Sequence, residues 1–165
     1  MLTRDDVFAV LDGVKDPEVP VLSVVELGVV RDVDVDAAGG VTVSVTPTYS
    51  GCPAMRVIEE DIVAALRARG VRDARVRTVY APAWTTEWMS DEAKAKLEAY
   101  GIAPPGPVAP LDDELVPLRR RPEIVRCPYC RSSDTALRSE FGSTACKSIR
   151  FCNSCRQPFE QFKAI

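Results

Sequence analysis

Thiols are the groups whose spacing in this sequence indicates chemistry. Four of the six cysteines form two pairs, Cys127-Pro-Tyr-Cys130 and Cys152-Asn-Ser-Cys155. Each pair places two sulfur atoms on one tight turn, and together the pairs supply the four thiolates of a tetrahedral zinc site. The chain contains no histidine, which excludes imidazole catalysis and histidine metal ligands. We therefore predict one structural zinc ion per chain, bound by these four cysteines.

The paired cysteines have two other interpretations. Rubredoxin-type iron also uses four thiolates, but structural zinc is the commoner occupant of such a site. A redox Cys-x-x-Cys needs only one pair in a thioredoxin-like strand and helix, which this loop-rich segment does not offer. A domain of about 40 residues is too small to fold on its apolar core alone, so bound metal would supply folding free energy.

A fifth thiol, Cys52, lies in the segment Thr46-Pro-Thr-Tyr-Ser-Gly-Cys-Pro53, between a predicted strand and a predicted helix. Pro53 suits the first helical position, which would make Cys52 the N-cap. The positive helix end and the hydroxyls of the loop, that of Thr46 among them, would stabilise a thiolate and lower its pKa. We interpret Cys52 as a reactive, metal-avid thiol, and a buried structural cysteine is the alternative.

The sixth thiol, Cys146, lies in Phe141-Gly-Ser-Thr-Ala-Cys-Lys147, outside both pairs. One interpretation is a small buried hydrophobic residue in a turn. The other uses the neighbouring cations Lys147 and Arg150, which would lower the pKa of an accessible thiol and allow it to act as a transient metal or cluster ligand.

Proline and charge divide the chain into three parts. Six of the thirteen prolines lie in residues 101–122, where they favour an extended linker. Residues 1–100 carry 11 basic and 17 acidic side chains, whereas residues 123–165 carry 7 and 4. We therefore expect an acidic domain at 1–100, a Pro-rich linker at 101–122 and a basic four-cysteine domain at 123–165.

The pattern of apolar residues predicts an α+β fold. A helix follows the N-cap Thr3, two alternating runs at 29–36 and 41–45 form a hairpin through Gly39-Gly40, and a second helix ends at Gly70. A third alternating run at 74–80 and a helix after Ser90 complete the domain. We expect a small mixed sheet with helices packed on one face, followed by a β-rich zinc ribbon with strands at 135–139 and 149–151.

Composition limits the class of protein further. The chain has 165 residues, no apolar run long enough to span a membrane, and a start without the layout of a signal peptide. We expect a cytoplasmic protein without disulfides. No cofactor loop, nucleophile–base pair or paired carboxylates are recognisable, so we do not expect an independent enzyme.

Several segments agree with a known family. They resemble the metal-sulfur cluster biosynthesis family, an α+β domain associated with iron–sulfur protein maturation, and the matching segments are Asp16-Pro17-Glu18, Glu26-Leu27-Gly28, Thr46 to Pro53 and Ala81 to Ser90. Joined to the four-cysteine ribbon, the whole chain apart from the linker resembles the phenylacetate-CoA oxygenase subunits of the PaaD, or PaaJ, family.

The resemblance implies roles for individual residues. The reactive cysteine of the family corresponds to Cys52, and its acidic companions correspond to Asp16 and Glu26. These two acids are otherwise readily explained as solvated loop residues, and they matter only if both approach Cys52. The tryptophans Trp84 and Trp88 match a surface motif of the family, although their spacing is equally compatible with core packing.

The resemblance also implies a function and partners. The expected role is that of an accessory factor in aerobic phenylacetate degradation, which assists delivery of iron or a transient iron–sulfur cluster to a phenylacetyl-CoA epoxidase. The expected partners are the epoxidase subunits, especially the [2Fe-2S] reductase component. The cargo would be held at Cys52 or shared across a homodimer.

Other functions remain open from the sequence. A structural subunit of the oxygenase needs no reactive thiol, so replacement of Cys52 would be harmless. A nucleic-acid-binding ribbon is suggested by the basic tail and by Arg119-Arg-Arg121, but the net charge of −3 opposes it.

Overall fold

The computed structural model describes residues 2–108 and 123–165. The chain divides into two compact units, Met1–Ala93 and Lys94–Ile165. The expected linker at 101–122 contributes one short strand to the second unit, and its residues 109–122 lie outside the described part of the chain. No helix in the described residues is long and apolar enough to cross a membrane.

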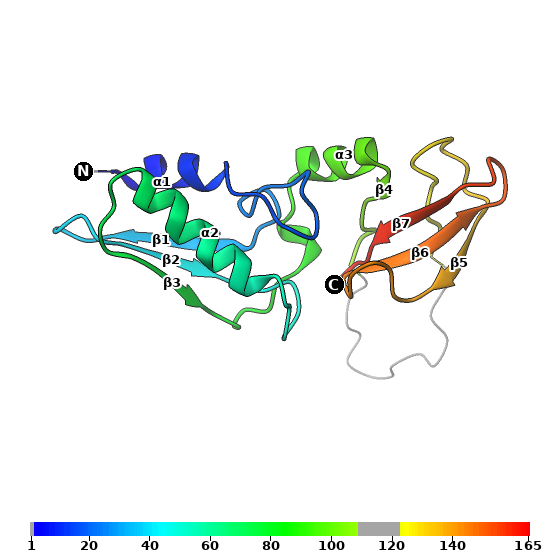
Figure 1. Ribbon diagram of the computed structural model, residues 1–165. Coiled ribbons are helices and arrows are strands. Elements are labelled where there is room, and N and C mark those ends of the chain that lie inside the picture. The colour runs from blue at the N-terminus through cyan, green and yellow to red at the C-terminus, as the bar shows by residue number, and fades with distance from the viewer. Residues whose placement is uncertain (1, 109–122) are drawn as a thin grey trace. The chain divides into compact units, whose positions relative to one another are not determined.

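The first unit contains the elements that the sequence predicts, in the predicted order (Figure 1). They are α1 (Arg4–Leu11), β1 (Val30–Val35), β2 (Val41–Val45), α2 (Met55–Ala68) and β3 (Ala74–Thr78). The short 3-10 helix η1 (Thr86–Trp88) follows β3 and is not predicted from the sequence. The helix α3 (Asp91–Tyr100) begins in this unit and continues into the second. The N-cap predicted at Thr3 is confirmed, and the side chains and backbones of Thr3 and Asp6 bond reciprocally in a capping box.

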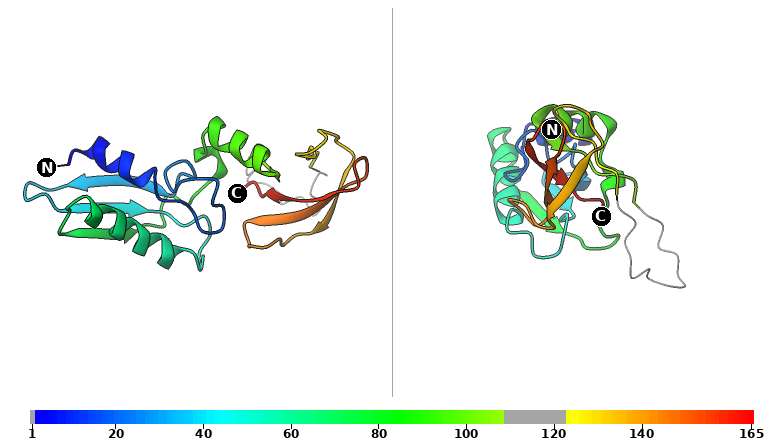
Figure 2. Two further views of the ribbon diagram at one scale, coloured as in Figure 1. Left: turned by 45° about the horizontal axis from the view of Figure 1, so that its top comes forward. Right: turned by 90° about the vertical axis from the view of Figure 1, so that its right-hand side faces the viewer.

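The three strands form a mixed sheet in the order β1-β2-β3. The hairpin makes β1 and β2 antiparallel, whereas β3 returns after α2 and runs parallel to β2. The helices α1 and α2 contact each other and pack on this sheet (Figures 1 and 2). The helix α2 turns Ile58, Ile62 and Leu66 into the core, as its apolar period predicts.

The second unit is built on a four-stranded sheet in the order β4-β7-β6-β5. Its strands are β4 (Ile102–Ala103), β5 (Thr135–Ser139), β6 (Lys147–Cys152) and β7 (Pro158–Phe162). The pairs β5–β6 and β6–β7 are antiparallel, and β4 adds to β7 in parallel. A small cluster of buried apolar residues lies beside this sheet, and its members are Ala103, Val125, Cys127, Cys152 and Phe159.

A polar network accompanies this small core. Arg150 donates from Nε to Oε1 of Gln161 at 2.7 Å, and Gln161 donates from Nε2 to Oε1 of Glu123 at 2.9 Å. Lys147 is buried and pairs with Glu160 at 3.0 Å. Two of the basic residues of this domain, Lys147 and Arg150, are therefore buried and paired inside it. The sequence alone does not predict their burial.

Candidate metal centre and the Cys52 loop

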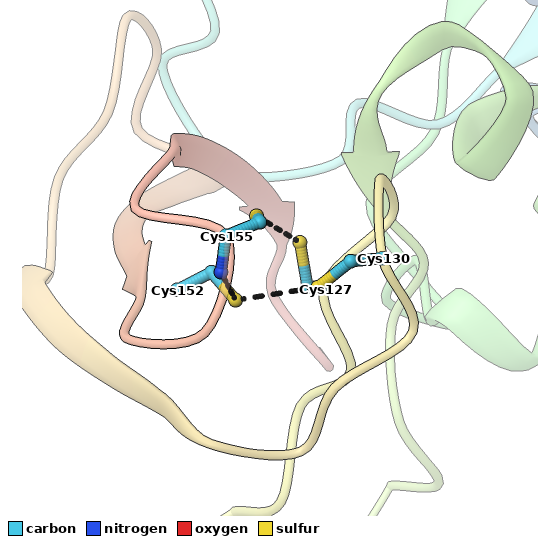
Figure 3. Close-up of side chains that lie close together, drawn as sticks. All are labelled: Cys127, Cys130, Cys152 and Cys155. Atoms are coloured by element: carbon cyan, nitrogen blue, oxygen red, sulfur yellow. Dashed lines mark hydrogen bonds between the residues drawn. The ribbon is translucent and has the colours of Figure 1, made fainter.

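Two turns of the same construction hold the four paired cysteines (Figure 3). In the first turn the backbone N–H of Arg131 donates to the carbonyl of Cys127 at 2.9 Å, and in the second that of Arg156 donates to Cys152 at 3.0 Å. Both arginines follow the second cysteine of a pair and both have left-handed backbone, with φ of 65° and 62°. Each pair thus presents two sulfur atoms to the same side of one tight turn.

The four sulfur atoms converge on a space of the size of one ion. They all lie within 4.8 Å of one another, and the Sγ atoms of Cys127 and Cys155 are 3.7 Å apart. The Sγ atoms of Cys130 and Cys152 are 3.5 Å apart. A tetrahedron with zinc–sulfur bonds of about 2.3 Å has edges of about 3.8 Å, whereas a disulfide bond is about 2 Å long. The geometry therefore fits a tetrahedral thiolate centre.

The thiols of the second turn differ in how readily they lose a proton in the metal-free chain. The backbone N–H of Cys155 donates to the sulfur of Cys152 and lowers the pKa of Cys152 to about 7. Burial raises the pKa of Cys155 to about 12. Binding of a dication to four thiolates must therefore release protons, which makes the affinity depend on pH.

Cys52 lies in a turn before α2 and not at its N-cap. The helix begins at Met55 with Ala54 as its N-cap, and the carbonyl of Cys52 accepts from the N–H of Met55 at 3.3 Å. The prediction that Cys52 caps the helix is therefore wrong. Its side chain is partly exposed, in contrast to the buried Thr46 at the start of the same loop.

The pKa of Cys52 is raised, which is also contrary to expectation. Burial is the largest cause, and the carboxylates of Glu18 and Asp16 add to it by disfavouring a second negative charge. A backbone hydrogen bond from Ala54 and a side-chain hydrogen bond from Tyr49 act in the opposite direction but do not outweigh these effects. Burial and the two acids therefore disfavour the thiolate of Cys52.

The acids that act on Cys52 are only partly those that the family resemblance implies. Asp16 is buried, and its carboxylate accepts from the N–H groups of Glu18 and Val19 at 2.8 Å. Glu26 accepts from the N–H of Ser23 at 2.9 Å, and its carboxylate is 3.9 Å from Lys15. Sequence reasoning misses Glu18 as a site residue, although it stands next to Pro17 in the Asp-Pro-Glu segment that carries the resemblance.

The tryptophan segment, residues 81–90, packs against other parts of the first unit. Trp84 is buried and donates from Nε1 to the carbonyl of Leu27 at 3.0 Å. The guanidinium of Arg31 lies 3.4 Å from the ring centroid of Trp88. Gly28 has φ of 75°, and a Cβ there would lie 3.0 Å from Cβ of Trp88. Two of the segments that carry the family resemblance therefore hold each other in place.

Cys146 is buried, and its sulfur lies 3.0 Å from the hydroxyl oxygen of Thr144. The accessible, cationic setting considered for this thiol is absent here, because the neighbouring Lys147 is buried and paired with Glu160. Its environment agrees with the interpretation as a small residue of the ribbon interior.

Comparison with known proteins assigns both parts of the chain. Residues 4–79 match the family model described as an iron–sulfur cluster assembly protein, and residues 112–163 match that of the PaaD zinc β-ribbon domain. A protein of Escherichia coli K12, named as a putative subunit of 1,2-phenylacetyl-CoA epoxidase, is 44% identical over 160 residues, which cover 97% of this chain and 92% of the relative.

Two further similarities concern the first unit. An "Fe-S protein maturation auxiliary factor" of Porphyromonas gingivalis is 38% identical over 96 residues, covering 58% of this chain and 90% of the relative. A crystal structure of a domain of unknown function, DUF59, from Bacillus anthracis is 33% identical, with a TM-score of 0.54, and the match covers 57% of this chain and 90% of that one.

Fold, cysteine centre and comparisons together define the class of protein: an iron–sulfur cluster assembly domain joined to a four-cysteine β-ribbon. Within that class, the E. coli relative decides the family, because its match covers both the assembly domain and the ribbon. The chain belongs to the PaaD family of phenylacetyl-CoA epoxidase subunits.

Proposed function

We propose that this protein is an accessory factor that assists delivery of iron or an iron–sulfur cluster to the phenylacetyl-CoA epoxidase system, with Cys52 as the residue that holds the cargo. The observation that carries the proposal is the setting of this thiol. It is partly exposed, it lies outside the four-cysteine centre, and the carboxylates of Glu18 and Asp16 are near enough to raise its pKa.

The same three groups would attract a cation to the sulfur of Cys52. The carboxylates that disfavour the thiolate in the empty loop favour a positively charged ion, and an ion bound there would in turn stabilise the thiolate of Cys52. Binding requires that the thiol proton leaves, with the Cys52 sulfur then donating to iron. The iron is cargo in this proposal, and it keeps its oxidation state during the exchange of ligands.

The Cys52 loop is also open, as transfer requires. Over the described residues, the paired cysteines are the one group of three or more Cys, Asp or Glu side chains that converges on an ion-sized space. A site with a complete ligand set holds its metal permanently, whereas a site with vacant positions accepts ligands from another molecule. The remaining ligands at Cys52 would come from the acceptor protein or from a second copy of this chain.

The four-cysteine centre has a different role in the proposal. It is a closed site with two fully buried ligands, Cys127 and Cys152, which suits a structural zinc ion. Zinc there would hold the second unit together and would not exchange during iron delivery. The partners proposed are the oxygenase components, the [2Fe-2S] reductase foremost among them.

Anaerobic reconstitution of the oxygenase system tests the proposal. The reductase apoprotein is incubated with iron, sulfide and either native protein or the variant Cys52→Ala, and its iron, acid-labile sulfide and electron-transfer activity are measured. We expect the native protein to raise cluster occupancy and Cys52→Ala to abolish that gain while zinc content stays unchanged. Cys146→Ala is the matched control, because it removes a buried thiol of the other unit.

A structural subunit of the oxygenase is the second candidate, favoured by the fact that the relative matching the whole chain carries an epoxidase subunit name. It predicts that Cys52→Ala restores full cluster occupancy and full oxygenase activity, whereas a chain lacking residues 94–165 does not copurify with the oxygenase. That pair of results would replace the delivery proposal.

A further inference from the structure

The outer surface of the ribbon carries an aromatic ring between two arginines. Phe151 on β6 is half-buried, and the guanidinium carbons of Arg138 and Arg156 lie 5.2 Å and 5.6 Å from its ring centroid. Arg138 comes from β5, and Arg156 follows the second cysteine pair. Both arginines are exposed. Stacking on the ring restricts the orientation of each guanidinium and leaves its N–H groups free to donate.

The backbone at Arg156 shows that this side chain is held at a cost. Its φ of 62° lies in the left-handed region, where a side chain costs about 1–2 kcal/mol and where glycine is favoured. Arg131 occupies the equivalent position of the first turn and uses its guanidinium in an ion pair with Glu98 at 3.3 Å. Both turns thus place an arginine where glycine would be favoured, and the two guanidinium groups differ in what they contact.

The charge at this surface is not neutralised within the ribbon. Two other cations of the domain, Lys147 and Arg150, pair internally with Glu160 and Glu123. Across residues 2–108 and 123–165, neither Arg138 nor Arg156 has a carboxylate within 4.0 Å. The two arginines therefore form a preorganised, uncompensated cationic pair.

We propose that Arg138, Phe151 and Arg156 form a docking surface for a carboxylate-rich segment of a partner protein. Guanidinium groups bind carboxylates through two parallel hydrogen bonds, and the ring between them offers an apolar contact to the aliphatic part of an acidic side chain. Two arginines are too few for the phosphate stripe of a nucleic-acid site, and the chain as a whole has a net charge of −3. This inference is independent of the role of Cys52.

Substitution by glycine gives a well-matched test. Arg156→Gly removes a guanidinium and relieves the left-handed backbone, so the fold should be kept, and Arg131→Gly does the same in the other turn without altering the surface around Phe151. Binding of the full chain to a fluorescent peptide of alternating glutamate and glycine is measured by anisotropy at several salt concentrations, beside an oligothymidylate of equal net charge. Zinc content and circular dichroism verify the fold of each variant.

We expect the native chain to bind the acidic peptide, with affinity falling as salt rises. Arg156→Gly and Arg138→Ser should each weaken it roughly fivefold to tenfold, and Arg131→Gly should leave it unchanged. Equal weakening by Arg131→Gly, or no measurable binding by the native chain, would overturn the proposal. Tighter binding of the oligothymidylate, lost in Arg156→Gly, would replace it with a nucleic-acid site.

Discussion

The reactivity of Cys52 depends on the balance between burial, hydrogen bonds and the two acids beside it. Burial raises the pKa of this thiol above its ordinary value of 9.0, and the charge of Glu18 raises it further. Alkylation of Cys52 should therefore be slow at pH 7 and should accelerate as pH rises through a midpoint above 9. Neutralising one of the acids lowers the pKa and increases the fraction of thiolate at any pH below that midpoint.

We predict that Glu18→Gln increases the rate of Cys52 alkylation by iodoacetamide at pH 8 by roughly twofold to fivefold. The modified cysteine is identified by mass spectrometry, and the rate is measured from pH 7 to pH 10. Glu26→Gln is the control, because Glu26 contacts Ser23 and Lys15 and its charge is not among the causes of the pKa shift of Cys52. Equal acceleration by both variants would show that the electrostatic effect is not specific to Glu18.

Gly28 is the residue that allows the tryptophan segment to approach the strand region. Its φ is 75°, and an added Cβ would meet Cβ and the carbonyl oxygen of Trp88 at 3.0 Å and 3.2 Å. We predict that Gly28→Ala destabilises the first unit by about 2–4 kcal/mol, from backbone strain and overpacking together. Urea denaturation followed by tryptophan fluorescence measures the loss.

Gly39→Ala separates the two contributions to that loss. Gly39 has a similar φ of 82°, but nothing lies within 4 Å of an added Cβ. It should cost only the backbone term of about 1–2 kcal/mol. If both variants lost the same free energy of unfolding, contact with Trp88 would not be the reason for a glycine at position 28.

Residue type and spacing predict the thiols of the two candidate sites, but neither the acid Glu18 nor the electrostatics around Cys52. Four paired thiols and one loop thiol stand out by type and spacing alone, and the structure does bring the four together. The direction of pKa shift predicted for Cys52 is wrong, because burial of the thiol and then the charges of Glu18 and Asp16 raise its pKa, and helix α2 begins only at Met55. Proximity between a loop before β1 and a loop after β2 follows from the tertiary fold, which a linear pattern does not encode.

Helices and strands with a clear periodicity of apolar residues are predictable from the sequence, whereas very short strands are not. The hairpin β1–β2, the helix α2 and the strand β5 follow from alternation, period and turn residues. The strand β4 has two residues, and its partner β7 is distant in sequence. Such a short strand forms only because it pairs with β7. Proline content, on which the sequence prediction relies, therefore places its residues in the linker.

The ion pair between β6 and β7 makes the ribbon sensitive to acid. Burial raises the pKa of Glu160, but hydrogen bonds from Ser143 and the buried Lys147 outweigh it, so that the net pKa is lowered. A carboxyl group with a lowered pKa in the fold stabilises it above the unfolded pKa, near 4.5. That stability is lost as pH falls through the folded value.

We predict that Glu160→Gln destabilises the zinc-loaded second unit by about 2 kcal/mol at pH 7, because it leaves the ammonium of Lys147 buried without its counter-charge. Urea denaturation measures the effect at pH 7 and pH 4, and metal analysis at each pH verifies that zinc stays bound, because zinc affinity itself falls as pH falls. The difference between native protein and variant should shrink at the lower pH. Glu60→Gln serves as control, since its pair with Arg56 is solvent-exposed and contributes little. A difference that is constant with pH would contradict the role of the ion pair.

At the scale of the whole molecule, the two units derive their stability from different sources. The first has an apolar core between a sheet and two helices, with Leu11, Ile62 and Leu66 fully buried. The second has a small cluster in which two of the five buried members are the metal ligands Cys127 and Cys152. Loss of the metal should therefore unfold the second unit and leave the first intact.

We predict that Cys127→Ser lowers bound zinc from about one ion per chain to a small fraction of that, and that protease cleavage within residues 94–165 becomes much faster. Residues 2–93 should stay resistant, since they contain no ligand of the four-cysteine centre. Metal analysis and limited proteolysis with mass spectrometry measure both effects, and a chelator added to native protein should reproduce them. Cys146→Ser is the matched control: it also replaces a buried thiol of the second unit but should keep its zinc. Full zinc content in Cys127→Ser would show that the four-cysteine centre does not hold the metal.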